Sequence, residues 1–128
     1  MVSRIAGNTK LSLQKAKDSA ITAVEIYNKP AIRFKSSSYI VLMIIAWTAL
    51  FQAVFYRRRI TPAYKDSEGR FISLDGDYKY WDLSECMKNY FEADHDNPIK
   101  KNLEFFIKLR NKIEHKSIPE IDAGIYGE

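Results

Sequence analysis

The chain has 128 residues, of which 46% are hydrophobic and 13% aromatic, and its formal net charge is +4. This length suits one small domain, and the apolar fraction excludes an intrinsically disordered chain. The single cysteine, Cys86, excludes an intramolecular disulfide and a cysteine-based zinc site, so we expect it to serve in packing. The modest basic charge suits a phosphate-bearing partner without identifying one.

The sequence of the N-terminal half predicts two helices. Residues 9–28 are expected to form the first, capped by Asn8 or Thr9 and ended by Pro30. Apolar residues at three- and four-residue spacing predict its buried stripe: Leu13, Ala16, Ala20, Val24 and Tyr27. The second predicted helix, residues 37–56, is the most apolar segment.

Residues 39–56 allow two interpretations. The segment is about 18 residues long and three arginines follow it, which suits a transmembrane helix and would make this a membrane-anchored protein. It also suits a central helix that is buried on most sides. The other helices have apolar stripes that need a partner, and no second spanning segment follows. We therefore favour burial, no membrane contact and a cytoplasmic location.

Residues 58–81 predict a hairpin-like excursion, because Asp66-Ser67-Glu68-Gly69 and Asp75-Gly76 are turn sequences. Aromatic residues alternate here with Lys65, Arg70 and Lys79: Tyr64, Phe71, Tyr78, Tyr80 and Trp81. Such rings either stack on RNA bases or fasten the loop to the core.

The C-terminal part predicts two more helices. Asp82 is expected to cap residues 83–92, and Asp96 or Asn97 to cap residues 98–115, with Pro98 at the first position. Asp94-His95-Asp96 adjoin in the intervening loop and favour capping over metal binding; we expect no metal site and no cofactor. The fold class is thus mainly α, a bundle of about four helices, and residues 117–128 are expected to begin a following segment of a longer protein.

Arg110 is the anomaly of the last helix. At 100° per residue it falls about 20° from Ile99, within an apolar stripe that also contains Leu103, Phe106, Ile107 and Ile113. A buried guanidinium needs a partner, because it cannot lose its charge. Glu114 or Glu25 can supply a carboxylate, the head can reach solvent, or a phosphate can be the partner.

His115 lies about 140° around a straight helix from Arg110, whereas Asn111 and His115 share a face. A histidine at a helix C-terminus is also favoured simply by the helix dipole. A second copy of the helix, related by a two-fold axis, can bring Arg110 and His115 together.

The ending Arg110-Asn111-Lys112-Ile113-Glu114-His115 resembles the ribonuclease signature of the HEPN superfamily, whose members are helical bundles. The stretches Ala23–Pro30, Arg33-Phe34 and Ala46–Leu50 resemble a branch of that superfamily that is a domain of unknown function. The resemblance spans residues 10–116.

The resemblance implies a metal-independent endoribonuclease that acts as a homodimer, in a bacterial defence or toxin system with an antitoxin or similar partner. His115 would be the general base or acid, Arg110 would hold the scissile phosphate, and Asn111 would orient either group. Lys108, Lys112 and Lys116 would attract the RNA backbone. The alternative is a non-catalytic module that binds RNA, a nucleotide or a partner protein.

Overall fold

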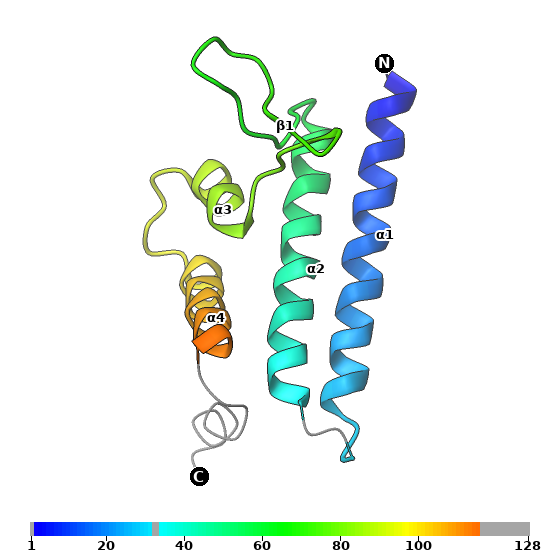
Figure 1. The fold of residues 1–128 in the computed structure, drawn as a ribbon, viewed down its shortest axis with the longest axis vertical. Coiled ribbons are helices and arrows are strands. Elements are labelled where there is room, and N and C mark those ends of the chain that lie inside the picture. Colours follow the sequence, from blue (N-terminus) through cyan, green and yellow to red (C-terminus); the bar gives the residue numbers. More distant parts are fainter. Residues whose placement is uncertain (1, 32–33, 116–128) are drawn as a thin grey trace.

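The computed structural model describes residues 2–31 and 34–115, and the side chains of residues 6–31 and 34–113. This part of the chain contains four helices and one small hairpin (Figure 1): α1 (Val2–Tyr27), α2 (Lys35–Arg57), β1 (Ser73–Leu74), β2 (Asp77–Tyr78), α3 (Leu83–Phe91) and α4 (Pro98–His115). The predicted fold class, mainly α with a small β excursion, is confirmed. The expected following segment, residues 117–128, lies outside the described residues.

The helix α2 is the centre of the described structure. It contacts each of the other three helices, whereas α1 contacts only α2. Figure 1 shows α1 antiparallel to α2 on one side, and α3 and α4 on the other. In that view α4 is almost end-on, so it crosses α2 steeply. Helices α1 and α4 are therefore separated by α2.

Small side chains form the seam between α1 and α2. Ala16 and Ala23 are buried on α1, and Ala46, Ala49 and Ala53 are buried on α2. Alanines at a seam let two helix backbones approach closely. The predicted stripe of α1 was therefore partly wrong, because Leu13 is 47% and Val24 49% exposed.

The beginning of α1 also differs from the prediction. The helix begins at Val2, so Asn8 and Thr9 are interior residues and not caps. Helix propensity is a weak local preference, of about 1 kcal/mol for a glycine such as Gly7, and the continuous helix overrides it. The remaining helix bounds agree with the predicted ones within two residues.

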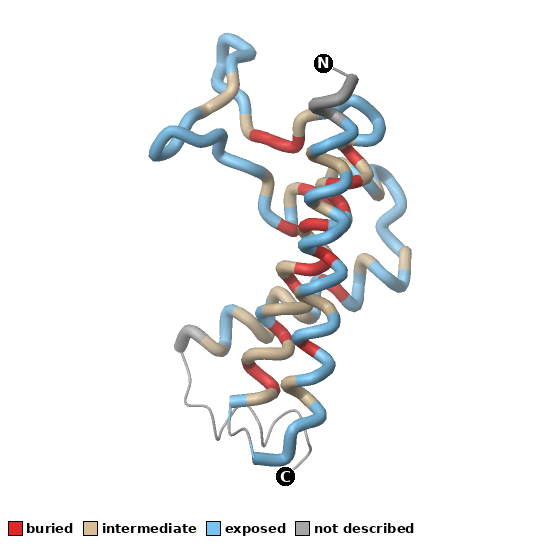
Figure 2. Tube along the Cα trace, turned by 90° about the vertical axis from the view of Figure 1, so that its right-hand side faces the viewer, coloured by how far each residue is buried: buried red, intermediate tan, exposed pale blue. Residues whose placement is uncertain are grey.

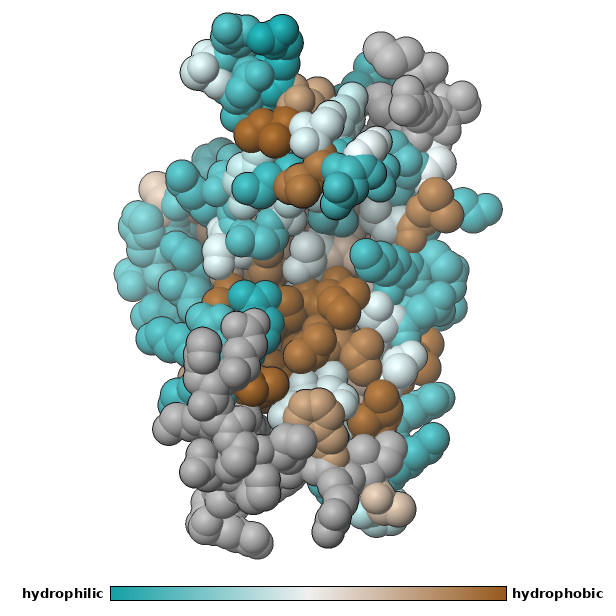
Figure 3. Space-filling view, in the orientation of Figure 1, coloured by the Kyte–Doolittle hydropathy of each residue, from teal (hydrophilic) through white to brown (hydrophobic). Residues whose placement is uncertain are grey.

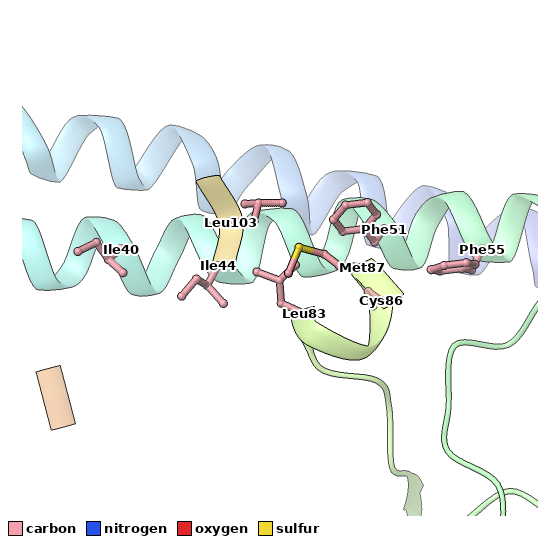
Figure 4. Close-up of a cluster of buried hydrophobic side chains, with 8 residues drawn as sticks. All are labelled: Ile40, Ile44, Phe51, Phe55, Leu83, Cys86, Met87 and Leu103. Atoms are coloured by element: carbon pink, nitrogen blue, oxygen red, sulfur yellow. The ribbon is translucent and has the colours of Figure 1, made fainter. Parts of the chain in front are cut away.

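The core lies where α3 and α4 meet α2 (Figure 4). Ile40, Ile44, Phe51 and Phe55 of α2 are buried against the following side chains of α3 and α4: Leu83, Cys86, Met87 and Leu103. Cys86 is 0% exposed, which confirms its packing role. Burial raises the pKa of its thiol to about 12, and the nearby Asp82 and Glu85 carboxylates add to the shift.

The burial of α2 also bears on the membrane question. Among the described helices, α2 is the one that is long and apolar enough to span a membrane. Nine of its 23 residues are buried by the rest of the chain, and Figure 2 shows buried segments along the middle of the molecule. Apolar side chains still gather on one face in the middle of Figure 3. The arrangement is that of a central helix with part of its surface uncovered.

The hairpin forms within the predicted excursion, but its paired strands have only two residues each. Ser73 pairs with Tyr78, and Leu74 with Asp77, in antiparallel register. The two turn residues, Asp75 and Gly76, have φ angles of 52° and 88°. This left-handed pair is what a type I′ turn requires, and an Asp-Gly sequence favours it. Figure 1 shows the excursion projecting beyond the end of α2.

Candidate nucleic-acid site

The helix that carries the predicted site begins as the sequence indicates. The side chain of Asn97 accepts a hydrogen bond from the backbone N–H of Ile99 at 2.9 Å and a longer one from Lys100 at 3.4 Å. Pro98 occupies the first helical position, where a missing N–H leaves no bond unmade. The cap fixes the start of α4, and so the direction in which every later residue points.

Arg110 lies on the packing face of α4. Leu103 is buried on the same face, and Phe106, Ile107 and Ile113 pack against the core. The Arg110 side chain is half-buried, and its Nε is shielded from solvent without a hydrogen-bond partner. The predicted placement in an apolar stripe is confirmed. Burial of an unsatisfied guanidinium donor costs roughly 1–3 kcal/mol.

One predicted partner of Arg110 is excluded. Glu25 belongs to α1, which lies across α2 from α4 and makes no contact with it. Within the described residues, the ion pairs join Arg70 to Asp66 and Glu68, and Lys101 to Asp96. The side chain of Glu114, the other predicted partner, lies outside the described side chains. No described carboxylate therefore neutralises Arg110.

Three of the remaining predicted site residues lie on the outer side of α4. Lys108, Asn111 and Lys112 are exposed. His115 is the last residue of α4, but its side chain lies outside the described ones, and Lys116 lies outside the described residues. Because α4 is helical throughout, position 115 shares a face with Asn111 and is about 140° from Arg110. Within one straight copy of α4, position 115 and Arg110 therefore face different directions.

The loop before α4 behaves as a capping loop. The Asn97 amide donates to the Asp94 carboxylate at 3.1 Å, and Asp96 pairs with Lys101 at 3.7 Å. The Nζ of Lys100 lies 3.4 Å from Nδ1 of His95. Among the described side chains, no group of three or more His, Cys, Asp or Glu is placed to hold a metal ion.

The aromatic residues of the excursion lie in two different environments. Trp81 packs edge-on against Phe55 with the ring centroids 5.2 Å apart, so it fastens the excursion to the core. Phe71 and Tyr78 stack on each other at 4.8 Å, away from that core. Tyr78 and Tyr80 are 43% and 44% exposed. Trp81 confirms the interpretation that the rings fasten the loop to the core, whereas the stacking of RNA bases on the exposed rings stays a prediction.

Comparison of the sequence with known proteins identifies a family. Residues 11–128 match the family described as "Domain of unknown function (DUF3644)". The chain belongs to this family. No curated protein and no solved structure matches it. The DUF3644 match covers α2, the excursion and α4 together, so the described fold and the Arg110 helix are part of one family domain.

Proposed function

We propose that this DUF3644 domain is a metal-independent endoribonuclease whose site is assembled from two copies of α4, as in HEPN ribonucleases. The observation that carries the proposal is Arg110, a half-buried cation in the apolar stripe that forms no ion pair with a described carboxylate. A phosphate oxygen is a strong acceptor for such a donor. The exposed Lys108, Asn111 and Lys112 border the same turns of the helix and supply attraction for an RNA backbone.

The proposed reaction is an internal transfer at phosphorus. A base, His115 of one copy, removes the proton from the ribose 2′-OH, and the 2′-oxygen attacks the phosphorus. The bond from phosphorus to the 5′-oxygen breaks, and an acid returns a proton to that oxygen. The products are a 2′,3′-cyclic phosphate and a 5′-OH. Arg110 stabilises the charge that develops on the phosphate oxygens.

The geometry of one chain supports a dimeric site. Arg110 faces inward, whereas position 115 lies on the outer side with Asn111, so a phosphate cannot easily meet both from one straight helix. The outer surface of α4 keeps a large apolar side chain for a second copy, because Phe105 is 58% exposed. The packing face itself is occupied within the chain, since Leu103 is only 3% exposed.

A non-catalytic module is the second candidate. The observation in its favour is the same separation of Arg110 from position 115, because a chain that does not dimerise would retain a phosphate-binding arginine without a base. Such a module would bind RNA or a partner protein through Arg110 and its neighbouring lysines. The two candidates differ in whether RNA is cut. In either case we place the domain in the cytoplasm, in a defence or toxin system.

The decisive experiment combines a cleavage gel with size-exclusion chromatography. Wild type in EDTA is expected to cut single-stranded RNA and to elute as a dimer, while Arg110→Ala and His115→Ala stop cleavage. Arg57→Ala and His95→Ala are matched controls, because both residues are exposed and lie away from these turns. A dimer that binds RNA without cutting it would favour the module. Cleavage by a strict monomer would contradict the two-copy site.

A further inference from the structure

A pocket at the base of the excursion is separate from the proposed ribonuclease site. It has a volume of about 590 Å³, which lies within the size range of small-ligand pockets. It lies beyond the C-terminal end of α2, between the excursion and α3. Its chemistry comes from two cations, one carboxylate and three rings: Arg59, Lys65, Glu85, Tyr64, Phe71 and Trp81.

The charged groups of this pocket are not paired with one another. Neither Arg59 nor Lys65 belongs to an ion pair among the described residues. The Lys65 ammonium instead lies 5.1 Å from the Phe71 ring centroid. The Glu85 carboxylate accepts a hydrogen bond from Asn89 at 2.9 Å. The pocket therefore presents two cations and one carboxylate, with an excess of positive charge.

The backbone of Arg59 adds an independent observation. Its φ angle is 62°, in the left-handed region where glycine is favoured. The N–H groups of Arg59 and Ile60 donate to the carbonyls of Tyr56 and Phe55, which closes α2 with a Schellman motif. Glycine is the usual residue at this position of the motif. This chain has Arg59 at that position in spite of the backbone strain, and the Arg59 side chain lines the pocket.

We propose that this pocket binds a nucleoside phosphate, with the phosphate on Arg59 and Lys65 and the base against the rings of Tyr64 and Trp81. Rings on which bases stack, beside cations that track phosphates, are the combination that proteins use for unpaired nucleotides. The ligand is either a free mononucleotide or an unpaired nucleotide within an RNA strand. The proposal goes beyond the ribonuclease activity, because Arg59 and Arg110 lie on different elements and share no described contact.

The experiment measures Trp81 fluorescence in the chain with Trp47→Phe and His115→Ala, so that one tryptophan reports and RNA is not cut. The titrants are AMP, GMP, CMP, UMP, adenosine, inorganic phosphate and a six-nucleotide single-stranded RNA. We expect saturable quenching by at least one nucleotide or by the RNA, and at least tenfold weaker binding in Arg59→Gly. Lys65→Ala is expected to weaken binding in the same direction.

Arg59→Gly is a sharp variant, because it removes the cation while it relieves the positive φ angle, so its melting midpoint is expected to stay equal or rise. Asp75→Gly is the matched control, since it relieves another positive φ angle away from the pocket. Binding of mononucleotides identifies a free ligand, and binding of the RNA alone identifies a strand.

Three results would overturn the proposal: no saturable binding, unchanged binding in both pocket variants, or equal affinity for inorganic phosphate and for every nucleotide. The test is separable from the ribonuclease proposal. Nucleotide binding that survives in Arg110→Ala, together with a wild-type protein that cuts no RNA, would sustain the pocket and reject the enzyme. Cleavage of RNA without nucleotide binding to the pocket would support the enzyme and reject the pocket.

Discussion

The ring of Tyr39 on α2 meets the ring of Phe106 on α4 edge-on, with the centroids 6.4 Å apart and the planes at 83°. On its other side the Tyr39 ring contacts the Tyr27 ring of α1, with the centroids 5.0 Å apart. The three rings link the three longest helices. Phe106 lies one turn before Arg110, so this contact helps to hold the helix that carries the proposed phosphate-binding arginine.

Removal of that ring is expected to destabilise the fold. Phe106→Ala loses apolar contacts with the core and the edge-on ring pair, and we expect a loss of about 2–4 kcal/mol in the free energy of unfolding. Urea denaturation followed by circular dichroism measures it. Leu11→Ala is the control, since that side chain on α1 is 70% exposed and its loss should cost less than about 0.5 kcal/mol. Equal losses in both variants would contradict the assigned packing.

A substitution of Arg110 is expected to remove RNA cleavage without lowering the stability of the fold. Arg110→Met keeps an unbranched apolar stem in the stripe and removes the unsatisfied Nε donor. We expect the free energy of unfolding to stay equal or to rise by about 1 kcal/mol, while RNA cleavage is lost. Thermal melts and the cleavage gel are compared on the same preparation. A marked loss of stability would mean that Arg110 has a structural partner and would weaken the proposed role.

The cap of α3 gives a local test. The Asp82 carboxylate accepts a hydrogen bond from the backbone N–H of Glu85 at 2.9 Å. Asp82→Ala is expected to cost about 1 kcal/mol of stability, and Asp82→Asn much less, because an amide oxygen can also cap. Chemical denaturation of both variants is the measurement. Identical losses in the two variants would point to the charge and not to the cap.

Cys86 is expected to be chemically inert in the folded protein. Its pKa is raised from 9.0 to about 12, chiefly by burial, so the reactive thiolate is scarce at pH 8. A thiol reagent at that pH should label the urea-unfolded chain and not the native one. Rapid labelling of the native protein would contradict the buried position.

The same shift has a consequence for stability. The folded thiol keeps its proton to higher pH than the unfolded thiol. Its contribution to stability is therefore complete below about pH 9 and is lost as pH rises toward 12. Cys86→Ala should flatten that part of the stability curve. An unchanged curve would assign the decline to other groups, such as Tyr56, whose pKa burial also raises.

Features set by neighbours in the chain could be predicted from the sequence. The caps Asp82 and Asn97, Pro98 at the start of α4 and the Asp75-Gly76 turn depend on a few adjacent residues, and all appear as expected. The periodicity of α4 likewise placed Arg110 in its apolar stripe. In each case the sequence spacing itself determines the geometry.

Features set by packing could not be read from the sequence. The predicted buried stripe of α1 was wrong at Leu13 and Val24, because α1 meets α2 through Ala16 and Ala23. Which residues are buried at such a seam depends on how closely the two helices approach. The same physics excluded Glu25 as a partner of Arg110. The sequence alone determined that Arg110 is a cation in an apolar stripe that needs a partner; only the tertiary structure, which puts α2 between α1 and α4, decided which carboxylate it cannot reach.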